Sequence, residues 1–332
     1  MSEFRQNFAT KEWVIIAPGR SARPNDFRNQ ASRVTEARPH RGDCPFCPGN
    51  EQQTGRETFR IANGSGWDVR IVQNKFAALD PAKSTTRHQH GRFLKSDSYG
   101  VAEIVIESPV HDETLTSMPM NRVQHVLRAY KERSAEIGRL KNMAIVMLFR
   151  NYGPGAGTSL EHPHAQIIGS PIIPPHIRDP FQKAALHYDS FGTCVYCDLL
   201  AEELRQAERI IASNEHFVSF CPYASRTPFE IRIYPRRHNA SFTWVSEAEL
   251  AAFASLLQTT LYRIGVVLGN PSYNFVIRSS PVGDEDVRYL HWYFLLIPKI
   301  TTPAGFEIGS GIYINPVAPE DCAEQLRRAD GQ

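Results

Sequence analysis

The feature that most constrains this chain of 332 residues is that its second half repeats the pattern of its first. In each half a Cys-x-x-Cys pair precedes two histidines, which lie 51 residues apart in the first half and 53 in the second. Such agreement in content and spacing indicates an internal duplication. The eight residues are Cys44, Cys47, His111 and His162, followed by Cys194, Cys197, His238 and His291.

Hydrophobic periodicity predicts the same elements in both halves. Residues 119–140 have apolar positions at the 3.6-residue spacing of an amphipathic helix, and residues 246–264 show the same spacing after a capping box at Ser246 and Glu249. The proline-rich run 171–175 is interpreted as an extended domain boundary. Short apolar runs predict strands at 13–16, 69–72, 100–107, 143–149, 162–169, 229–238, 273–277 and 291–298. We therefore expect an α+β fold with two tandem domains, residues 1–175 and 176–332.

The repeated cysteines and histidines form a donor set that suits zinc. Two thiolates and two imidazoles fill a tetrahedral site and leave no position for water, so both metals are expected to be structural. We predict two zinc ions per chain, with iron as the alternative in one site. The competing interpretation of each Cys-x-x-Cys, a redox pair, is disfavoured by its repetition with paired histidines. Another histidine pair, His88 and His90, is interpreted as part of a solvated loop. Residues 44–49 are expected to form a knuckle-like turn, and 194–197 to match it.

Composition narrows the range of partners. The net charge is only +2, with 42% hydrophobic and 22% charged residues, which argues against a nucleic-acid surface or a polybasic membrane anchor. The N-terminus lacks the apolar region of a signal peptide, and no run approaches the ~20 apolar residues of a membrane span. We expect a cytoplasmic protein that binds neither nucleic acid nor membrane.

The chemistry is expected at the segment His162-Pro163-His164-Ala165-Gln166. Side chains alternate along a strand, so His162, His164 and Gln166 are predicted to share one face. If a metal holds His162, then His164 is held rigidly and stays free to react. A neutral imidazole attacks phosphorus, and the resulting phosphoramidate passes the group on. The second half has Tyr293 at the position of His164, so only the first half offers a histidine nucleophile.

Several nearby residues are candidate phosphate ligands. Gln166, Ser159 and the backbone N–H groups of the glycine-rich segment around Gly157 could stabilise charge on a transferring phosphoryl group. Arg20 and Arg23, on a proline-stiffened loop, could bind further phosphate oxygens through bidentate hydrogen bonds. The alternative for these two is that they are ordinary surface arginines.

These motifs resemble the galactose-1-phosphate uridylyltransferase family, a duplicated branch of the histidine-triad superfamily, from about residue 4 to residue 320. The matching stretches are 13–24, Cys44-Pro45-Phe46-Cys47, 74–79, Glu107-Ser108-Pro109-Val110-His111 and 162–166. The resemblance implies that each domain is histidine-triad-like, an antiparallel sheet with a long helix, and that the protein is a homodimer. It also implies that His164 is nucleotidylated, that Gln166 and Ser159 hold the phosphate, and that the nucleotide site contains Arg20, Arg23, Asn74 and Asn151.

The C-terminal segment departs from the bacterial members of this family. Ser310 and Gly311 stand where those enzymes have a tyrosine–glutamate pair that reads the hexose hydroxyls. This segment and the second Cys-x-x-Cys pair resemble the plant branch that acts as an ADP-glucose phosphorylase. Without two hydrogen-bonding side chains, discrimination among hexoses is expected to be loose.

The resemblance implies a ping-pong transfer of a nucleotidyl group between a nucleotide-sugar and a sugar 1-phosphate. The first reading is uridylyl exchange between UDP-glucose and galactose 1-phosphate. The alternative is an adenylyltransferase that uses phosphate as acceptor, as an ADP-glucose phosphorylase does. A non-catalytic zinc protein that binds nucleotides is a third reading. A zinc-finger nucleic-acid binder is disfavoured by the near-neutral charge and the lack of an aromatic-basic stripe.

Overall fold

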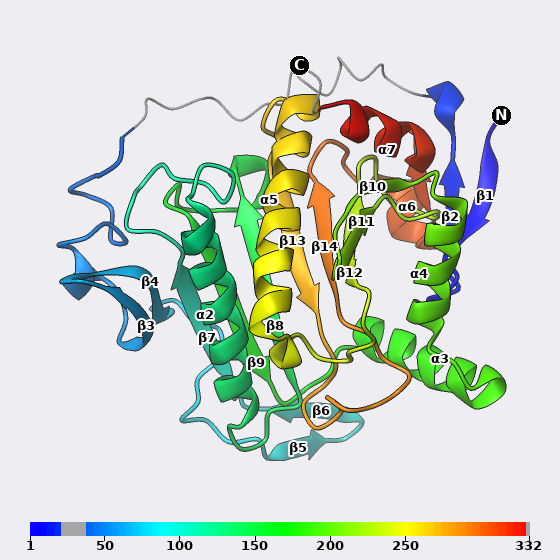
Figure 1. Ribbon diagram of the computed structural model, residues 1–332. Coiled ribbons are helices and arrows are strands. Elements are labelled where there is room, and N and C mark those ends of the chain that lie inside the picture. Colours follow the sequence, from blue (N-terminus) through cyan, green and yellow to red (C-terminus); the bar gives the residue numbers. More distant parts are fainter. Residues whose placement is uncertain (21–37, 330–332) are drawn as a thin grey trace.

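The computed structural model describes residues 1–20 and 38–329, and at its centre is one ten-stranded antiparallel sheet (Figure 1). The first half contributes five neighbouring strands in the order β3-β4-β7-β9-β8, and the second half continues with β13-β14-β12-β11-β10. The strands are β3 (Glu57–Asn63), β4 (Gly66–Gln73), β7 (Val101–Ile106), β8 (Ile145–Tyr152), β9 (His164–Ser170), β10 (Ile210–Ser213), β11 (Phe217–Phe220), β12 (Ile231–Pro235), β13 (Tyr273–Arg278) and β14 (Tyr293–Pro298).

The two halves of this sheet mirror each other about one pair of strands. Strands β8 and β13 occupy equivalent places in the two copies and pair antiparallel at the centre, with Phe149 opposite Val276. The duplication is therefore visible in the strand order, and the expected α+β fold is confirmed. The two half-sheets form one continuous sheet, because the edge strand of each copy, β8 or β13, pairs with the edge strand of the other.

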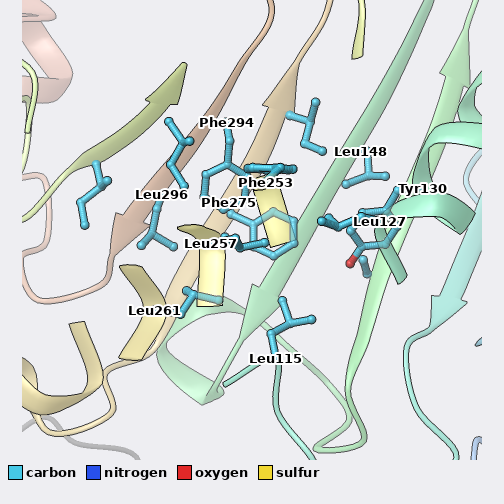
Figure 2. Packing of buried hydrophobic residues seen from close by; sticks show 14 of the residues in the cluster. Leu115, Leu127, Tyr130, Leu148, Phe253, Leu257, Leu261, Phe275, Phe294 and Leu296 are labelled. Atoms are coloured by element: carbon cyan, nitrogen blue, oxygen red, sulfur yellow. The ribbon is translucent and has the colours of Figure 1, made fainter. Parts of the chain in front are cut away.

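Two long helices cover one face of the sheet, as their periodicity predicts. Helix α2 (Met120–Gly138) buries Val123, Val126, Leu127, Tyr130 and Ile137, which lie on one side of the helix. Helix α5 (Glu247–Leu268) begins with the expected capping box and is capped at its C-terminus by Gly269, whose φ of 72° favours glycine. Each fully buried side chain of this kind contributes about 2 kcal/mol. Figure 2 shows residues of both helices packed against Leu148, Phe275, Phe294 and Leu296 of the strands.

Helix α5 is also long and apolar enough, by length and composition alone, to cross a membrane. The expectation that no run approaches such a span was therefore wrong. Half of the relevant window is buried inside the protein, and Phe253, Leu257 and Leu261 lie in the main core. The apolar character of α5 is accounted for by its contact with the sheet.

The catalytic candidates follow the alternation expected along β9. Ala165 and Ile167 are buried in the main core, so His164 and Gln166 belong to the opposite, outer face of the sheet. The strand begins at His164, two residues later than predicted. His162 precedes it because Pro163 has no N–H for the ladder, and the Pro163 carbonyl accepts a bond from Glu107 N at 3.1 Å.

Two helices that periodicity did not predict follow the proline-rich run, α3 (Pro175–Phe191) and α4 (Val195–Gln206). Cys194 is the N-cap of α4, so Cys197 lies in a helix, and the expectation of a second knuckle-like turn was wrong. Ala184, Tyr196 and Leu200 of these helices cluster with Val218 and Phe220 of β11. The outer face of the second half is thus covered by α3 and α4.

The remaining elements lie at the edges. The segment with His88 and His90 was expected to be a loop, but it forms strand β5 (Arg87–His90) of an exposed hairpin with β6 (Phe93–Ser96). A separate three-stranded sheet joins the N-terminal region to a late strand, in the order β1 (Glu3–Gln6), β2 (Trp13–Ile16) and β15 (Tyr313–Asn315). Two short helices, α6 (Gly305–Ser310) and α7 (Pro319–Arg328), flank β15 in sequence.

Candidate functional site

The first cysteine and histidine quartet is assembled and buried. Cys44 and Cys47 come from the turn before β3, His111 from the segment after β7, and His162 from the residues before β9. Cys47 Sγ lies 3.4 Å from His111 Nδ1 and 3.6 Å from His162 Nδ1, and the two Nδ1 atoms are 3.3 Å apart. Residues distant in sequence therefore converge on one point.

These distances fit a tetrahedral zinc site. Zinc bonds of about 2.3 Å to sulfur and about 2.05 Å to nitrogen place two nitrogens about 3.3 Å apart and a sulfur and a nitrogen about 3.6 Å apart. Cys44 Sγ to His162 Nδ1 is 3.7 Å, so this pair agrees as well. The donor set and its spacing both suit the metal that the sequence predicts.

A backbone carbonyl orients His162. The His162 Nε2–H donates to the Ser108 carbonyl oxygen at 2.8 Å, which leaves Nδ1 unprotonated and directed at the cysteines. Burial lowers the pKa of His162 to about 4, which also favours the neutral ring that a metal ligand requires. The corresponding carbonyl in the second half, that of Pro235, accepts from His291 Nε2–H at 3.1 Å.

His164 is held so that one ring nitrogen remains available. Its Nδ1–H donates to the His162 carbonyl at 2.8 Å, and this bond assigns the lone pair to Nε2. Among the described residues, Nε2 has no hydrogen-bond partner. Burial lowers the pKa of His164, which keeps the imidazole neutral. The Phe46 ring packs edge-on against it, with centroids 5.5 Å apart. The arrangement presents a neutral, oriented imidazole with one lone pair available.

A polar network that the sequence did not suggest ties helix α2 to this site. Arg122 Nη2 donates to Ser108 Oγ at 2.7 Å, and Ser108 Oγ–H donates to Glu113 at 2.5 Å. Arg122 also pairs with Glu113 at 2.8 Å and lies 3.8 Å from Asp68. His125 Nδ1 contacts the same Asp68 at 2.7 Å. Since the Ser108 carbonyl holds His162, these side chains position the candidate metal ligand indirectly.

A buried ion pair lies at the start of the same segment. Arg150 of β8 pairs with Glu107 at 3.0 Å, and both side chains are almost wholly inaccessible. Tyr130 O–H of α2 donates to Glu107, and Arg150 Nη1 donates to Tyr273 O–H at 3.0 Å. Burial raises the pKa of Glu107, which Arg150 opposes. This network joins the two halves next to β9, because Arg150 lies on β8 and Glu107 follows β7, the two strands that flank β9.

The phosphate and nucleotide candidates come from several segments of the first half. Gln166 is half-buried on β9, whereas Ser159 and Gly157 are exposed in the preceding turn, where Gly157 has a φ of 83°. Asn151 accepts from Asn274 Nδ2 at 2.8 Å, a bond between the two halves. Asn74 Oδ1 accepts from the backbone N–H of Phe76, which leaves its amide nitrogen for a ligand. A role in nucleotide binding for these residues stays a prediction.

Two candidates cannot be placed in the same way. Arg20 closes a short helical turn, Pro18–Arg20, and Arg23 lies outside the described residues. At the C-terminal departure, Ser310 Oγ–H donates to the Phe306 carbonyl within α6 at 2.6 Å, and its oxygen accepts from Ile312 N at 3.1 Å. The Ser310 hydroxyl is therefore engaged locally.

The second quartet is also assembled, with its histidine ligand atoms again Nδ1. Cys197 Sγ lies 3.3 Å from both His238 Nδ1 and His291 Nδ1. A hydrogen bond from Cys197, with further bonds from the two histidines, lowers the pKa of the Cys194 thiol and favours its thiolate. His238 is exposed, so this site lies nearer the surface than the first. Its donor set fits zinc for the same chemical reason.

Comparison with known proteins agrees with these features. The model of the galactose-1-phosphate uridyl transferase N-terminal domain matches residues 1–174, and that of a domain of unknown function, DUF4921, matches residues 125–329. An ADP-glucose phosphorylase from Arabidopsis thaliana is 33% identical over 330 residues, 98% of this chain and 92% of that protein. A galactose-1-phosphate uridylyltransferase from Thermotoga maritima is 27% identical over 99% of both proteins.

Solved structures agree as well. The crystal structure of an Arabidopsis thaliana ADP-glucose phosphorylase with bound ADP-glucose gives a TM-score of 0.83 at 30% identity and covers 98% of this chain and 99% of that one. A uridylyltransferase structure gives a TM-score of 0.77 at 26% identity, covering 99% and 98%. With the duplicated Cys/His quartets and the His162-Pro163-His164 segment, these matches show that the chain belongs to the galactose-1-phosphate uridylyltransferase family of the histidine-triad superfamily of nucleotidyltransferases.

Proposed function

We propose that this enzyme transfers a nucleotidyl group through a covalent intermediate on His164, with ADP-glucose as donor and phosphate as acceptor. The observation that carries the proposal is the geometry of His164. Its Nδ1–H is bound to the His162 carbonyl, and its Nε2 lone pair is left for attack. The acceptor-only role of Nε2 is what a nucleophile toward phosphorus requires.

The proposed reaction has two displacements at the same phosphorus. In the first, Nε2 attacks the α-phosphorus of ADP-glucose, an N–P bond forms, and the bond from that phosphorus to the bridging oxygen breaks, which releases glucose 1-phosphate. In the second, a phosphate oxygen attacks the α-phosphorus, the N–P bond breaks, and ADP leaves. The Nδ1–H bond to the His162 carbonyl stabilises the positive ring of the intermediate. Gln166 is the candidate donor to the phosphoryl oxygens.

The comparisons favour the phosphorylase reading over uridylyl exchange. The Arabidopsis ADP-glucose phosphorylase is 33% identical to this chain, whereas the Thermotoga uridylyltransferase is 27% identical. The local engagement of Ser310 also agrees with an acceptor site that does not read hexose hydroxyls there. UDP-glucose with galactose 1-phosphate is the second candidate reaction, supported by the family that the chain belongs to.

We also propose that both quartets hold zinc, with iron as the alternative in one, and that the protein works as a homodimer. With four protein ligands in each site, the metals would act by fixing structure, and the first would keep His162 in place next to the nucleophile. Exposed apolar side chains on α6, Phe306 and Ile308, are suited to a subunit interface. Light scattering would test the dimer.

The reaction is tested with a matrix of donors and acceptors. ADP-glucose and UDP-glucose are combined with phosphate, glucose 1-phosphate and galactose 1-phosphate, and kcat/KM is compared. We expect ADP-glucose with phosphate to give the highest value. Without acceptor, ADP-glucose radiolabelled in its adenylyl group should leave an acid-labile, base-stable label on the protein. The label should be absent in His164→Ala and retained in the control His88→Ala, which removes an exposed histidine of β5.

Other outcomes would separate the alternatives. With UDP-glucose as donor, a kcat/KM about 10⁴ times higher for galactose 1-phosphate than for phosphate would establish uridylyl exchange. Hydrogen-bonded pockets achieve a preference of this size. Folded protein that binds nucleotides tightly but neither labels nor turns over would support a non-catalytic role and contradict the proposal.

A further inference from the structure

The outer face of the second half has a cavity at the place that corresponds to the catalytic face of the first. Tyr293 follows His291 by two residues, as His164 follows His162, and Arg278 pairs with Tyr293 across the β13–β14 ladder. In the first half, Phe149 pairs with Gln166, so the same register brings Asn151 opposite His164. The duplication has thus kept the face and replaced histidine by tyrosine and asparagine by arginine.

This cavity has a volume of about 130 Å³ and is lined by three arginines. Arg226 pairs with Glu12 at 2.5 Å, and Arg232 pairs with Glu230 at 3.2 Å. Arg278 is half-buried and has no ion-pair partner among the described residues. One positive charge in the lining is therefore not balanced within this part of the structure.

Two of the lining side chains also have buried polar atoms without partners. Arg232 is 8% exposed, its guanidinium lies over the Tyr293 ring, and its Nε–H donates to no described atom. Ser280 is likewise 8% exposed, and its hydroxyl has no partner. A buried polar group without a hydrogen bond is costly, so such atoms beside a cavity point to a ligand that supplies acceptors.

We propose that this cavity is a second, non-catalytic site that binds inorganic phosphate. Arginine recognises tetrahedral oxyanions through charge-assisted hydrogen bonds, and the unpaired Arg278 charge would balance one charge of the ion. The volume is far below the 300 Å³ or more of a typical small-molecule pocket, so a nucleotide-sugar does not fit. Tyr293 replaces the histidine nucleophile, so the site binds without transfer. This inference does not depend on the reaction proposed for His164.

Equilibrium dialysis of the full chain against radiolabelled phosphate, at an ionic strength fixed with chloride, tests the site. Arg278→Gln removes the unpaired charge and should weaken one class of phosphate site by about tenfold, the effect of losing one charge-assisted contact. Ser280→Ala keeps all charges and should weaken the same class by a smaller factor. The control Arg205→Gln removes an arginine of the α4 surface, which pairs with Glu202, and should change nothing. Melting temperatures verify that each variant is folded.

The result must also be distinguished from binding at the catalytic face. Gln166→Ala should leave this class of site unchanged. Phosphate binding that Gln166→Ala weakens, while Arg278→Gln and Ser280→Ala do not, would place the ion at His164 and overturn the proposal. No saturable binding, or an equal loss in Arg205→Gln, would overturn it as well. If Arg278→Gln does not fold, Ser280→Ala decides, because its substitution only removes a hydroxyl.

Discussion

Ser108 connects His162, a candidate metal ligand, to a network of charged side chains. Its carbonyl oxygen accepts from His162 at 2.8 Å, and its hydroxyl is bound by Arg122 and Glu113. A backbone atom thus orients a candidate metal ligand, and an ion-pair network fixes the backbone atom. Outer partners of this kind commonly decide how well a ligand is placed.

The first prediction at the residue scale concerns Arg122, whose guanidinium balances Glu113 and Asp68. Arg122→Met would leave two largely buried carboxylates without their cation, so the free energy of unfolding should fall by about 3 kcal/mol. Urea unfolding measures the change. Arg128→Met, on the same helix but in an exposed pair with Glu247, should cost no more than about 0.5 kcal/mol. Equal effects of the two variants would show that the Arg122 network does not stabilise the fold.

A second prediction separates the two proposed metals. Cys194→Ser or His238→Ala should reduce zinc from two to one per chain and lower the melting temperature, while His164 is still labelled. His162→Ala should lower both stability and labelling, because without this metal ligand the backbone whose carbonyl orients His164 is no longer fixed by the metal. Elemental analysis and thermal unfolding measure these effects, since structural zinc contributes several kcal/mol to folding. Wild-type protein that stays folded and active without metal would contradict the assignment.

At the scale of the element, helix α5 shows how a local signal and a tertiary contact combine. Ser246 and Glu249 form the capping box that the sequence predicts, with Glu249 accepting from Ser246 N at 2.8 Å. Arg237, which follows β12, reaches the same carboxylate at 2.8 Å. The start of the helix is therefore tied to the segment that leads to His238. Helix α2 has no side-chain cap, and contacts with the sheet determine its position.

This double role predicts a pH dependence. The hydrogen bond from Arg237 is the largest cause that lowers the pKa of Glu249, from 4.5 to about 2. A lowered carboxyl pKa means that the stabilisation is fully present above pH 4.5 and is lost as the pH falls toward 2. Glu249→Gln should reduce the free energy of unfolding by about 1 kcal/mol at neutral pH. The gap to wild type should be constant between pH 8 and pH 5, by urea titration, and narrow below. A gap that is independent of pH would refute the role of the charge.

At the scale of the whole molecule, the decisive feature is the seam between β8 and β13. Both strands are interior to one sheet, and Asn151, Arg150 and Tyr152 of β8 bond to residues of the second half. Helices α2 and α5 also share one core on the same face. Each half on its own would therefore expose an unpaired central strand and part of the shared hydrophobic core.

The whole-molecule prediction is that the two halves unfold together. Calorimetry should show one transition whose calorimetric and van't Hoff enthalpies agree. Fragments cut between residues 174 and 175 should not fold alone, because each exposes a central strand and part of the common core. Two separate transitions, or a soluble folded fragment, would show that the halves are independent domains.

Much of this protein was determined by its sequence alone. The duplication, the two quartets, the helices α2 and α5 and most sheet strands were predicted, because periodicity and residue spacing are local properties that survive in one chain. The His164/Tyr293 difference between the copies likewise predicts that the first half carries the nucleophile. The candidate phosphate ligands Gln166, Ser159 and Gly157 are predictions from the same local reasoning.

The tertiary structure decided the rest. The two half-sheets join through β8 and β13. Hydrophobic periodicity predicts a strand but not the strand with which it pairs, so this junction could not be predicted. Only the folded structure shows the roles of the Ser108 carbonyl and the Arg122 side chain. A backbone acceptor has no signature in the sequence, and Arg122 is one polar residue among many on α2. The candidate metal ligand Cys194 lies at a helix cap rather than in a turn because α4 packs on the outer sheet face. Long-range packing, not local preference, set these features.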